Sequence, residues 1–306
     1  MTLEKGLAAF LDAMLGKNRS SATLRAYKTD VLQFIRFLHE NNVAITEVGD
    51  VGKVDVLEYL AALARKGLTG VARARKVSAI REYFRFLEGV GCIQKSPTAG
   101  IDTPKREKHT RQFLRSDEYT KMLSLAGGHP RDYAILQVFL QTGIRVSELA
   151  NLTREDVDFI KPAIRVRGKG NQEREIALEK RGVQALKNYL AVRPENLSDV
   201  LFFNYKGEPI SERGIRKLVV KYRKNAGITK RASCHSLRHT FATYKAEKGV
   251  SPYQLQQWLG HANLNTTQIY VHLGKQNAKK IMEQTSLTFP IHNFSKHSCA
   301  FPANTP

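Results

Sequence analysis

The stretch KSPTAGIDTPKREKHTRQ, Lys95–Gln112, divides the chain into two parts with different apolar patterns. It holds two prolines, many charged residues and few large apolar ones, so it is typical of a linker between folded domains. We therefore predict a first domain at residues 1–95, a basic linker at 96–112, a second domain at 113–286 and an aperiodic tail at 287–306.

The first domain is predicted to be helical. In SSATLRAYKTDVLQFIRFLHENN, residues 20–42, apolar residues recur every three or four positions, which is the period of a helix with one buried face. Similar patterns predict helices at 1–17, 53–67 and 71–91, the last two ending near glycines.

Net charge indicates the kind of partner. Lys and Arg total 49 against 28 acidic residues, a formal charge of +21, which favours a polyanion. Nucleic acid is our first interpretation, an anionic membrane surface the second, and a protein that is merely basic the third. Six basic residues on helix 71–91 and in the linker are candidates for DNA contact, although the helical ones could equally form a solvated face. They are Arg73, Arg75, Lys76, Arg81, Lys105 and Arg106.

The sequence gives little indication of a targeting peptide, a membrane span or disulfide bonds. The apolar N-terminal segment carries Glu4 and Asp12, which argues against a signal or transit peptide. No apolar run is long enough to span a bilayer, and the three cysteines, Cys92, Cys234 and Cys299, are too widely spaced for a disulfide framework. We expect a cytoplasmic protein.

The second domain mixes two periods. Helical patterns cover 116–126, 129–143 and the segment from Ile144, and they resume after residue 180. Between them, AIRVRGKGNQEREIAL, residues 163–178, alternates apolar and polar residues around Gly168-Lys169-Gly170-Asn171. This pattern predicts a β-hairpin with a glycine-rich tip, so the fold class is mainly α with a small β-sheet.

Polar residues of the second domain suit phosphate chemistry. A guanidinium can bond two phosphate oxygens, a lysine at a hairpin tip can protonate a leaving 5′-oxygen, and a tyrosine can attack phosphorus. Each residue alone also fits an ordinary structural role. The candidates are Arg145, Lys169, His235, Arg238, His261 and Tyr270.

A metal site is the competing interpretation of CHSLRHTFATY, residues 234–244, because His235 and His239 are four residues apart. A zinc motif of the HExxH type requires a glutamate where Ser236 stands. Asp156 and Asp158 suit a two-metal nuclease, but their surroundings are typical of a turn. We therefore expect no metal and, without a GxxxxGK[ST] motif, no ATP site. His239 is assigned to packing or to support of the catalytic residues.

Four motifs carry a family resemblance. QTGIRVSELANL, RGKGNQEREIAL, HSLRHTFATYKAEKGV and WLGHANLNTTQIYVHL closely resemble the tyrosine recombinase family of phage-type integrases and Xer-like recombinases. TLRAYKTDVLQFIRFL and SAIREYFRFL in the first domain also resemble that family's helical core-binding domain. The catalytic order of the family maps onto the six candidates, and Glu148 matches an acidic position beside the first arginine.

The resemblance implies an all-helical, SAM-like core-binding domain and a mixed α+β catalytic domain that close around a DNA duplex. Tyr270 would form a 3′-phosphotyrosyl link while Arg145 and Arg238 stabilise the transition state and Lys169 protonates the leaving oxygen. His235 would act as acid–base partner, and His261 would bond a non-bridging oxygen. No cofactor is implied. A homotetramer on a specific core site, with a C-terminal segment docking in trans, would form and resolve a Holliday junction.

Two other functions remain open. A type IB topoisomerase has a similar active site but works as a monomer, and an accessory factor would bind DNA without chemistry. Within the recombinases, the long tail after Tyr270 slightly favours an enzyme of a mobile element. The sequence does not decide between integration, excision and resolution, nor does it reveal an accessory protein.

Overall fold

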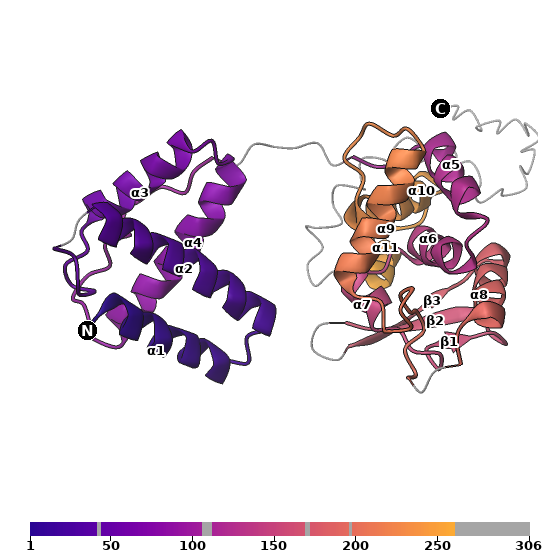
Figure 1. Ribbon diagram of the computed structural model, residues 1–306, viewed down its shortest axis with the longest axis horizontal. Coiled ribbons are helices and arrows are strands. Elements are labelled where there is room, and N and C mark those ends of the chain that lie inside the picture. Colours follow the sequence, from indigo (N-terminus) through magenta and orange to yellow (C-terminus); the bar gives the residue numbers. More distant parts are fainter. Residues whose placement is uncertain (42–43, 106–111, 169–171, 196–197, 261–306) are drawn as a thin grey trace, which may run out of the picture. The chain divides into compact units, whose positions relative to one another are not determined.

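The structure, a computed structural model, consists of two compact units, Met1–Thr110 and Arg111–Pro306 (Figure 1). The described residues are 1–41, 44–105, 112–168, 172–195 and 198–260. Within these residues, no helix is both long and apolar enough to cross a membrane.

The first unit is helical, as predicted. The helices in its described residues are α1 (Leu3–Gly16), α2 (Ser21–Asn41), α3 (Lys53–Arg65) and α4 (Gly70–Gly89). Their apolar faces meet in one core, in which Phe34 of α2 and Phe84 of α4 are fully buried and pack edge to face. The predicted helical period therefore identifies the buried side of each helix.

The first residues of the predicted linker pack against the helical unit. Thr98 and Ile101 are buried, and Ile101 joins the apolar core of the helical unit. Arg81 of α4 donates from Nη2 to the Ile101 carbonyl oxygen at 2.9 Å. Burial of an apolar side chain is favourable, so the burial of Ile101 stabilises the packing of residues 96–101 against the helices, although this segment contains a proline and a glycine. Residues 106–111 lie outside the described part, so the end of the linker stays a prediction.

The second unit combines helices with a small sheet. Its helices are α5 (Ser116–Ala126), α6 (Pro130–Thr142), α7 (Val146–Ala150), α8 (Lys180–Val192), α9 (Glu212–Asn225), α10 (Cys234–Glu247) and α11 (Pro252–Leu259). Its strands are β1 (Val157–Asp158), β2 (Ala163–Arg167) and β3 (Glu173–Ala177). The sheet is antiparallel in the order β1-β2-β3, which confirms the predicted hairpin and adds β1, a short strand that we had read as a turn.

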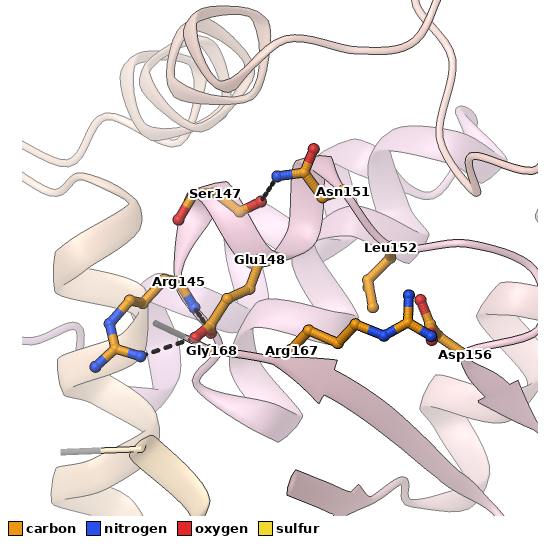
Figure 2. Close-up of a pocket in the computed structure, with 8 residues that line it drawn as sticks. All are labelled: Arg145, Ser147, Glu148, Asn151, Leu152, Asp156, Arg167 and Gly168. Atoms are coloured by element: carbon orange, nitrogen blue, oxygen red, sulfur yellow. Dashed lines mark hydrogen bonds and ion pairs between the residues drawn. The ribbon is translucent and has the colours of Figure 1, made fainter. Parts of the chain in front are cut away.

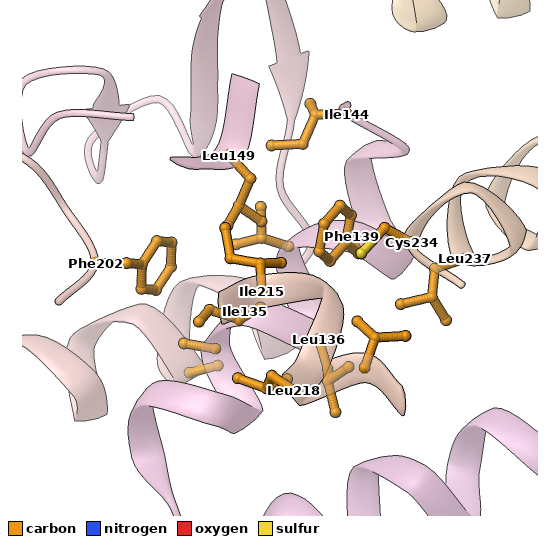
Figure 3. Close-up of a cluster of buried hydrophobic side chains, with 14 of the residues drawn as sticks. Ile135, Leu136, Phe139, Ile144, Leu149, Phe202, Ile215, Leu218, Cys234 and Leu237 are labelled. Carbon is orange, nitrogen blue, oxygen red and sulfur yellow. The ribbon is translucent and has the colours of Figure 1, made fainter. Parts of the chain in front are cut away.

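Helix α6 lies at the centre of this unit, with α5, α8 and α10 packed against it. Ile135, Leu136 and Phe139 are fully buried and contact a cluster that includes Leu218 of α9 and Leu237 of α10 (Figure 3). Since α6 is covered on most sides, its apolar run is nearly continuous rather than confined to one stripe.

Gly143 ends α6 and directs the chain into the candidate site. Its φ of 60° lies in the left-handed region, which glycine adopts without steric cost. A Cβ atom at this position would lie 2.4 Å from Cδ1 of Phe241 on α10. The tight turn buries Ile144 and places Arg145 at the start of α7.

Candidate active site

Three arginines from three elements converge on the C-terminal end of α11. They are Arg145 at the start of α7, Arg174 on β3 and Arg238 on α10, and we call them the arginine cluster. Each donates to one of three successive carbonyl oxygens: Arg174 Nε to Trp258 at 2.8 Å, Arg238 Nη2 to Leu259 at 2.6 Å, and Arg145 Nη2 to Gly260 at 2.7 Å. The last carbonyls of a helix have no intrahelical partner and carry partial negative charge, so they suit cationic donors.

Gly260 permits this convergence. It ends α11 with a φ of 60°, and a Cβ atom there would approach Nη1 of Arg174 to 3.0 Å. Glycine therefore supplies both the left-handed turn and the space that the arginine occupies. Leu259 is fully buried and Trp258 partly buried in an apolar cluster of α10 and α11.

Arg238 joins two helix ends. It is only 4% exposed, and its Nη1 donates to the Gly143 carbonyl at 2.7 Å while Nη2 donates to Leu259. The same guanidinium thus holds the ends of α6 and α11 together, and each of these helices ends in a left-handed glycine. These two hydrogen bonds to backbone carbonyls hold the Arg238 guanidinium in one position.

Glu148 holds the other two members of the arginine cluster. This carboxylate, 7% exposed, accepts from the Arg145 backbone N at 2.7 Å and from Arg145 Nη1 at 2.8 Å. It also accepts from Arg174 Nη1 at 3.0 Å and Nη2 at 2.8 Å. Burial by itself raises the pKa of Glu148, but the hydrogen bonds from Arg174 and Arg145 outweigh it, so the pKa lies below its ordinary value.

Glu148→Gln should therefore destabilise the protein in a pH-dependent manner. Loss of one charge from a buried ion pair costs about 3–5 kcal/mol, and glutamine retains part of the bonding, so we expect a loss of about 2–4 kcal/mol at neutral pH. Because the folded pKa is lowered, the carboxylate stabilises the fold above its unfolded pKa and loses this effect as pH falls through the folded value. Urea unfolding over a pH series should show the gap between wild type and variant shrinking below about pH 4.5. A gap that stays constant with pH would contradict a role for the charge.

A cavity of about 400 Å³ opens beside Arg145 and Glu148 (Figure 2). Arg167 and Asp156 line its other end, and the lining includes Gly168, which directly precedes Lys169 in the sequence. The side chain of Arg145 is 40% exposed, so this member of the arginine cluster can meet a ligand.

The other predicted catalytic residues are placed only in part. His235 lies exposed in the first turn of α10, and His239 is half-buried one turn further on. Lys169, His261 and Tyr270 lie outside the described residues, so their catalytic roles stay predictions. In sequence, His261 directly follows Gly260, where the arginine cluster converges.

Asp156 and Asp158 serve turns in the structure. Asp156 accepts from the backbone N and Oγ1 of Thr153 at 2.9 and 2.8 Å. Asp158 accepts from the backbone N atoms of Ile160 and Lys161 at 2.7 and 2.8 Å. Asp156 thus lies in the turn before β1, as predicted, whereas Asp158 is the last residue of β1 and bonds the turn that follows. In the part of the chain that is described, no group of three or more His, Cys, Asp or Glu could hold a metal ion.

The basic residues proposed for DNA contact differ in position. The expected surface position of Lys76 is wrong: it is 6% exposed, and its ammonium donates to Asp30 at 3.1 Å and also to Gln33. Asp30 is buried in α2, and the positive charge of Lys76 offsets its desolvation. Arg75 also pairs with Asp30 but keeps a side chain that is about half exposed.

The remaining DNA-contact candidates stay predictions. Arg81 bonds the Ile101 carbonyl and Oγ1 of Thr103. Arg73 is half-buried and Lys105 exposed, while Arg106 lies outside the described residues.

Arg174 is the member of the arginine cluster that was not among the predicted site residues. It pairs with Val166 across the hairpin, in phase with the buried pair Ile164 and Ile176, so alternation predicts an apolar residue at this position. A charged side chain on the buried face of a strand requires buried partners. This charged residue at an apolar position of the alternation is the feature of the sequence that could have identified Arg174.

Comparison with known proteins identifies the family. Residues 112–277 match the phage integrase family, and residues 7–89 match the phage integrase N-terminal SAM-like domain. A tyrosine recombinase XerC of Thermodesulfovibrio yellowstonii is 35% identical over 283 residues, covering 89% of this chain and 92% of the relative. A XerC of Lacticaseibacillus casei is 33% identical over 301 residues, covering 94% of this chain and 100% of the relative.

Solved structures agree in fold. The crystal structure of XerA recombinase is 30% identical, with a TM-score of 0.53, and covers 94% of this chain and 100% of its own. A lambda integrase dimer bound to a COC′ core site has a TM-score of 0.73 at 20% identity, with 87% and 97% covered, which shows the fold alone.

The fold, the site and these matches define a DNA strand-transferring enzyme. The chain belongs to the phage integrase family. Within that family it is a site-specific tyrosine recombinase similar to the XerC proteins. The predicted SAM-like helical domain and mixed catalytic domain are confirmed.

Proposed function

We propose that this chain cuts and rejoins DNA strands at a specific core site through a covalent link between Tyr270 and a 3′-phosphate. The phenolate oxygen of Tyr270 attacks the scissile phosphorus, the bond from phosphorus to the 5′-oxygen breaks, and that oxygen leaves as a hydroxyl. One phosphodiester is thereby exchanged for another, so the step consumes no high-energy co-reactant.

The observation that best supports this chemistry is the convergence of Arg145 and Arg238 at adjacent carbonyl oxygens, those of Gly260 and Leu259. Two fixed guanidinium groups from different helices suit the two non-bridging oxygens of a phosphodiester. Because the groups are held before substrate arrives, they need little reorganisation as negative charge builds up in the transition state.

The other roles follow from chemistry and sequence position. Lys169, which follows Gly168 in the sequence between β2 and β3, would donate the proton to the leaving 5′-oxygen. His235 in the first turn of α10 would serve as acid–base partner on the tyrosine side, and His261 would bond a non-bridging oxygen. The carbonyl oxygens that the arginine cluster binds belong to residues 258–260, immediately before His261 in sequence, which is consistent with this arrangement.

We further propose that attack by a partner strand's 5′-hydroxyl on the phosphotyrosyl link forms a Holliday junction, which a second round resolves. A lambda integrase tetramer bound to a Holliday junction shares the fold of this chain, with a TM-score of 0.73. The corresponding assembly would be a homotetramer in which a segment such as GKQNAKKIMEQTSL, residues 274–287, docks in trans. Exposed basic residues such as Arg75 and Lys105 would contact DNA phosphates, and the enzyme would act in the cytoplasm.

A trapping experiment tests the proposal. A core site is first selected from a random-sequence duplex pool with the full-length protein, and a nick is then placed beside its cleavage position so that the released 5′ fragment diffuses away. After denaturation, a covalent protein–DNA adduct should appear on this duplex but not on a scrambled one. Relaxation of plasmid lacking the site would instead indicate a type IB topoisomerase. Salt-dependent binding with no adduct at any protein concentration would indicate an accessory factor.

A further inference from the structure

Arg174 is a buried arginine that the proposed chemistry does not use. It lies on β3 opposite Val166, on the hairpin face that also buries Ile164 and Ile176. Its side chain is 13% exposed, whereas that of Arg145 is 40% exposed. A guanidinium in such surroundings costs free energy unless its donors are satisfied, so its contacts indicate why it is there.

Every nitrogen of the Arg174 guanidinium is engaged. Nη1 and Nη2 donate to Oε1 and Oε2 of Glu148 at 3.0 and 2.8 Å, a two-pronged contact. Nε donates to the Trp258 carbonyl at 2.8 Å. Arg174 therefore faces protein groups, and its geometry suits a fixed frame rather than contact with substrate.

Both anchors of Arg145 are held by Arg174. Arg145 is bound on one side by Glu148 and on the other by the Gly260 carbonyl. Arg174 donates hydrogen bonds to Glu148 directly. It also donates to the end of α11 at the carbonyl of Trp258, two residues before Gly260. A Cβ atom built on Gly260 would lie only 3.0–3.3 Å from atoms of the Arg174 guanidinium, so this guanidinium packs closely against the backbone of Gly260.

We propose that Arg174 is a positioning residue for phosphate transfer, which acts by holding Glu148 and the end of α11 so that Arg145 points at the scissile phosphate. The inference rests on the proposed function, since it concerns the efficiency of that same reaction. A displacement of about 1 Å in a substrate-positioning group can lower a rate about 100-fold.

Lysine cannot replace arginine here. It keeps the charge but offers one nitrogen, which cannot bridge both oxygens of Glu148 and reach Trp258 at the same time. Arg174→Lys should therefore lower the single-turnover rate of adduct formation by about 10- to 100-fold while DNA affinity stays unchanged. Arg165→Lys is the matched control, because Arg165 lies on the exposed face of the same hairpin, and it should react at the wild-type rate.

A double-mutant cycle separates positioning from general damage to the fold. Once Arg145→Lys has removed the group that Arg174 positions, adding Arg174→Lys should slow the reaction little further. Independent slowing by the two substitutions, with rate factors that multiply, would overturn the inference. So would an Arg174→Lys protein that forms adduct as fast as wild type.

A readout in the free protein checks the contact itself. Since Arg174 lowers the pKa of Glu148, Arg174→Lys should raise that pKa, as followed by carbon-13 NMR of labelled glutamate carboxyls. An unchanged pKa would overturn the inference. Absence of adduct with the wild-type protein would contradict the proposed function instead, so the two failures are distinguishable.

Discussion

Tyr270→Phe should bind its core site with wild-type affinity and form no covalent adduct. Removing the phenol oxygen removes the attacking atom, and loss of a covalent nucleophile lowers rates by at least about 10,000-fold. DNA affinity should persist because it depends mainly on basic residues and phosphates. Gel-shift titration measures binding, and denaturing electrophoresis of the nicked duplex measures the adduct.

Tyr253→Phe is the matched control for this experiment. Tyr253 lies on α11 and is exposed, and no role in the reaction is assigned to it. Its loss should leave both binding and adduct formation at wild-type levels. An adduct that persists in Tyr270→Phe would show that another residue is the nucleophile.

Arg238→Lys should slow adduct formation by about 100- to 1,000-fold, the usual effect of removing one preorganised donor to a transition-state oxyanion. Lysine retains the charge but cannot donate to the carbonyls of Gly143 and Leu259 while also meeting a phosphate oxygen. The substitution should also lower the free energy of unfolding by about 1–3 kcal/mol, because a buried carbonyl loses its donor. Single-turnover kinetics well below the variant's melting temperature measure the rate effect.

Arg193→Lys controls for the loss of stability. Arg193 also donates to backbone carbonyls, those of Val200 and Leu201, but it lies just after α8, and none of its hydrogen bonds within the described residues is to the arginine cluster. Its lysine variant should lose stability and keep its rate of adduct formation. If both variants slow the reaction equally, the effect of Arg238→Lys reflects folding and not the phosphate.

Local patterns in the sequence were sufficient to predict the helices and the hairpin. The period of α2 and the alternation of β2 and β3 depend on neighbours within a few residues, so they can be read without knowing the fold. The glycine that ends α6 was likewise visible as a stop signal after an apolar run.

Contacts between distant segments were not predictable from those patterns. Lys76 is buried because Asp30, on another helix, supplies an opposite charge, and nothing in the pattern of α4 indicates that pairing. In the same way, the motifs identified Arg145 and Arg238, but only the fold shows that they bond the end of α11. For Arg174, the sequence shows a charged residue where the strand alternation predicts an apolar one. Only the fold explains it, because Arg174 pairs with the buried carboxylate of Glu148.

The central claim is that the arginine cluster serves a tyrosine nucleophile at position 270. Its most direct measurement is the identification of the linked residue: the adduct is digested with protease and nuclease, and the modified peptide is sequenced by mass spectrometry. We predict a nucleotide attached through its 3′-phosphate to Tyr270 in the wild-type protein. A link to another residue, or through a 5′-phosphate, would contradict it.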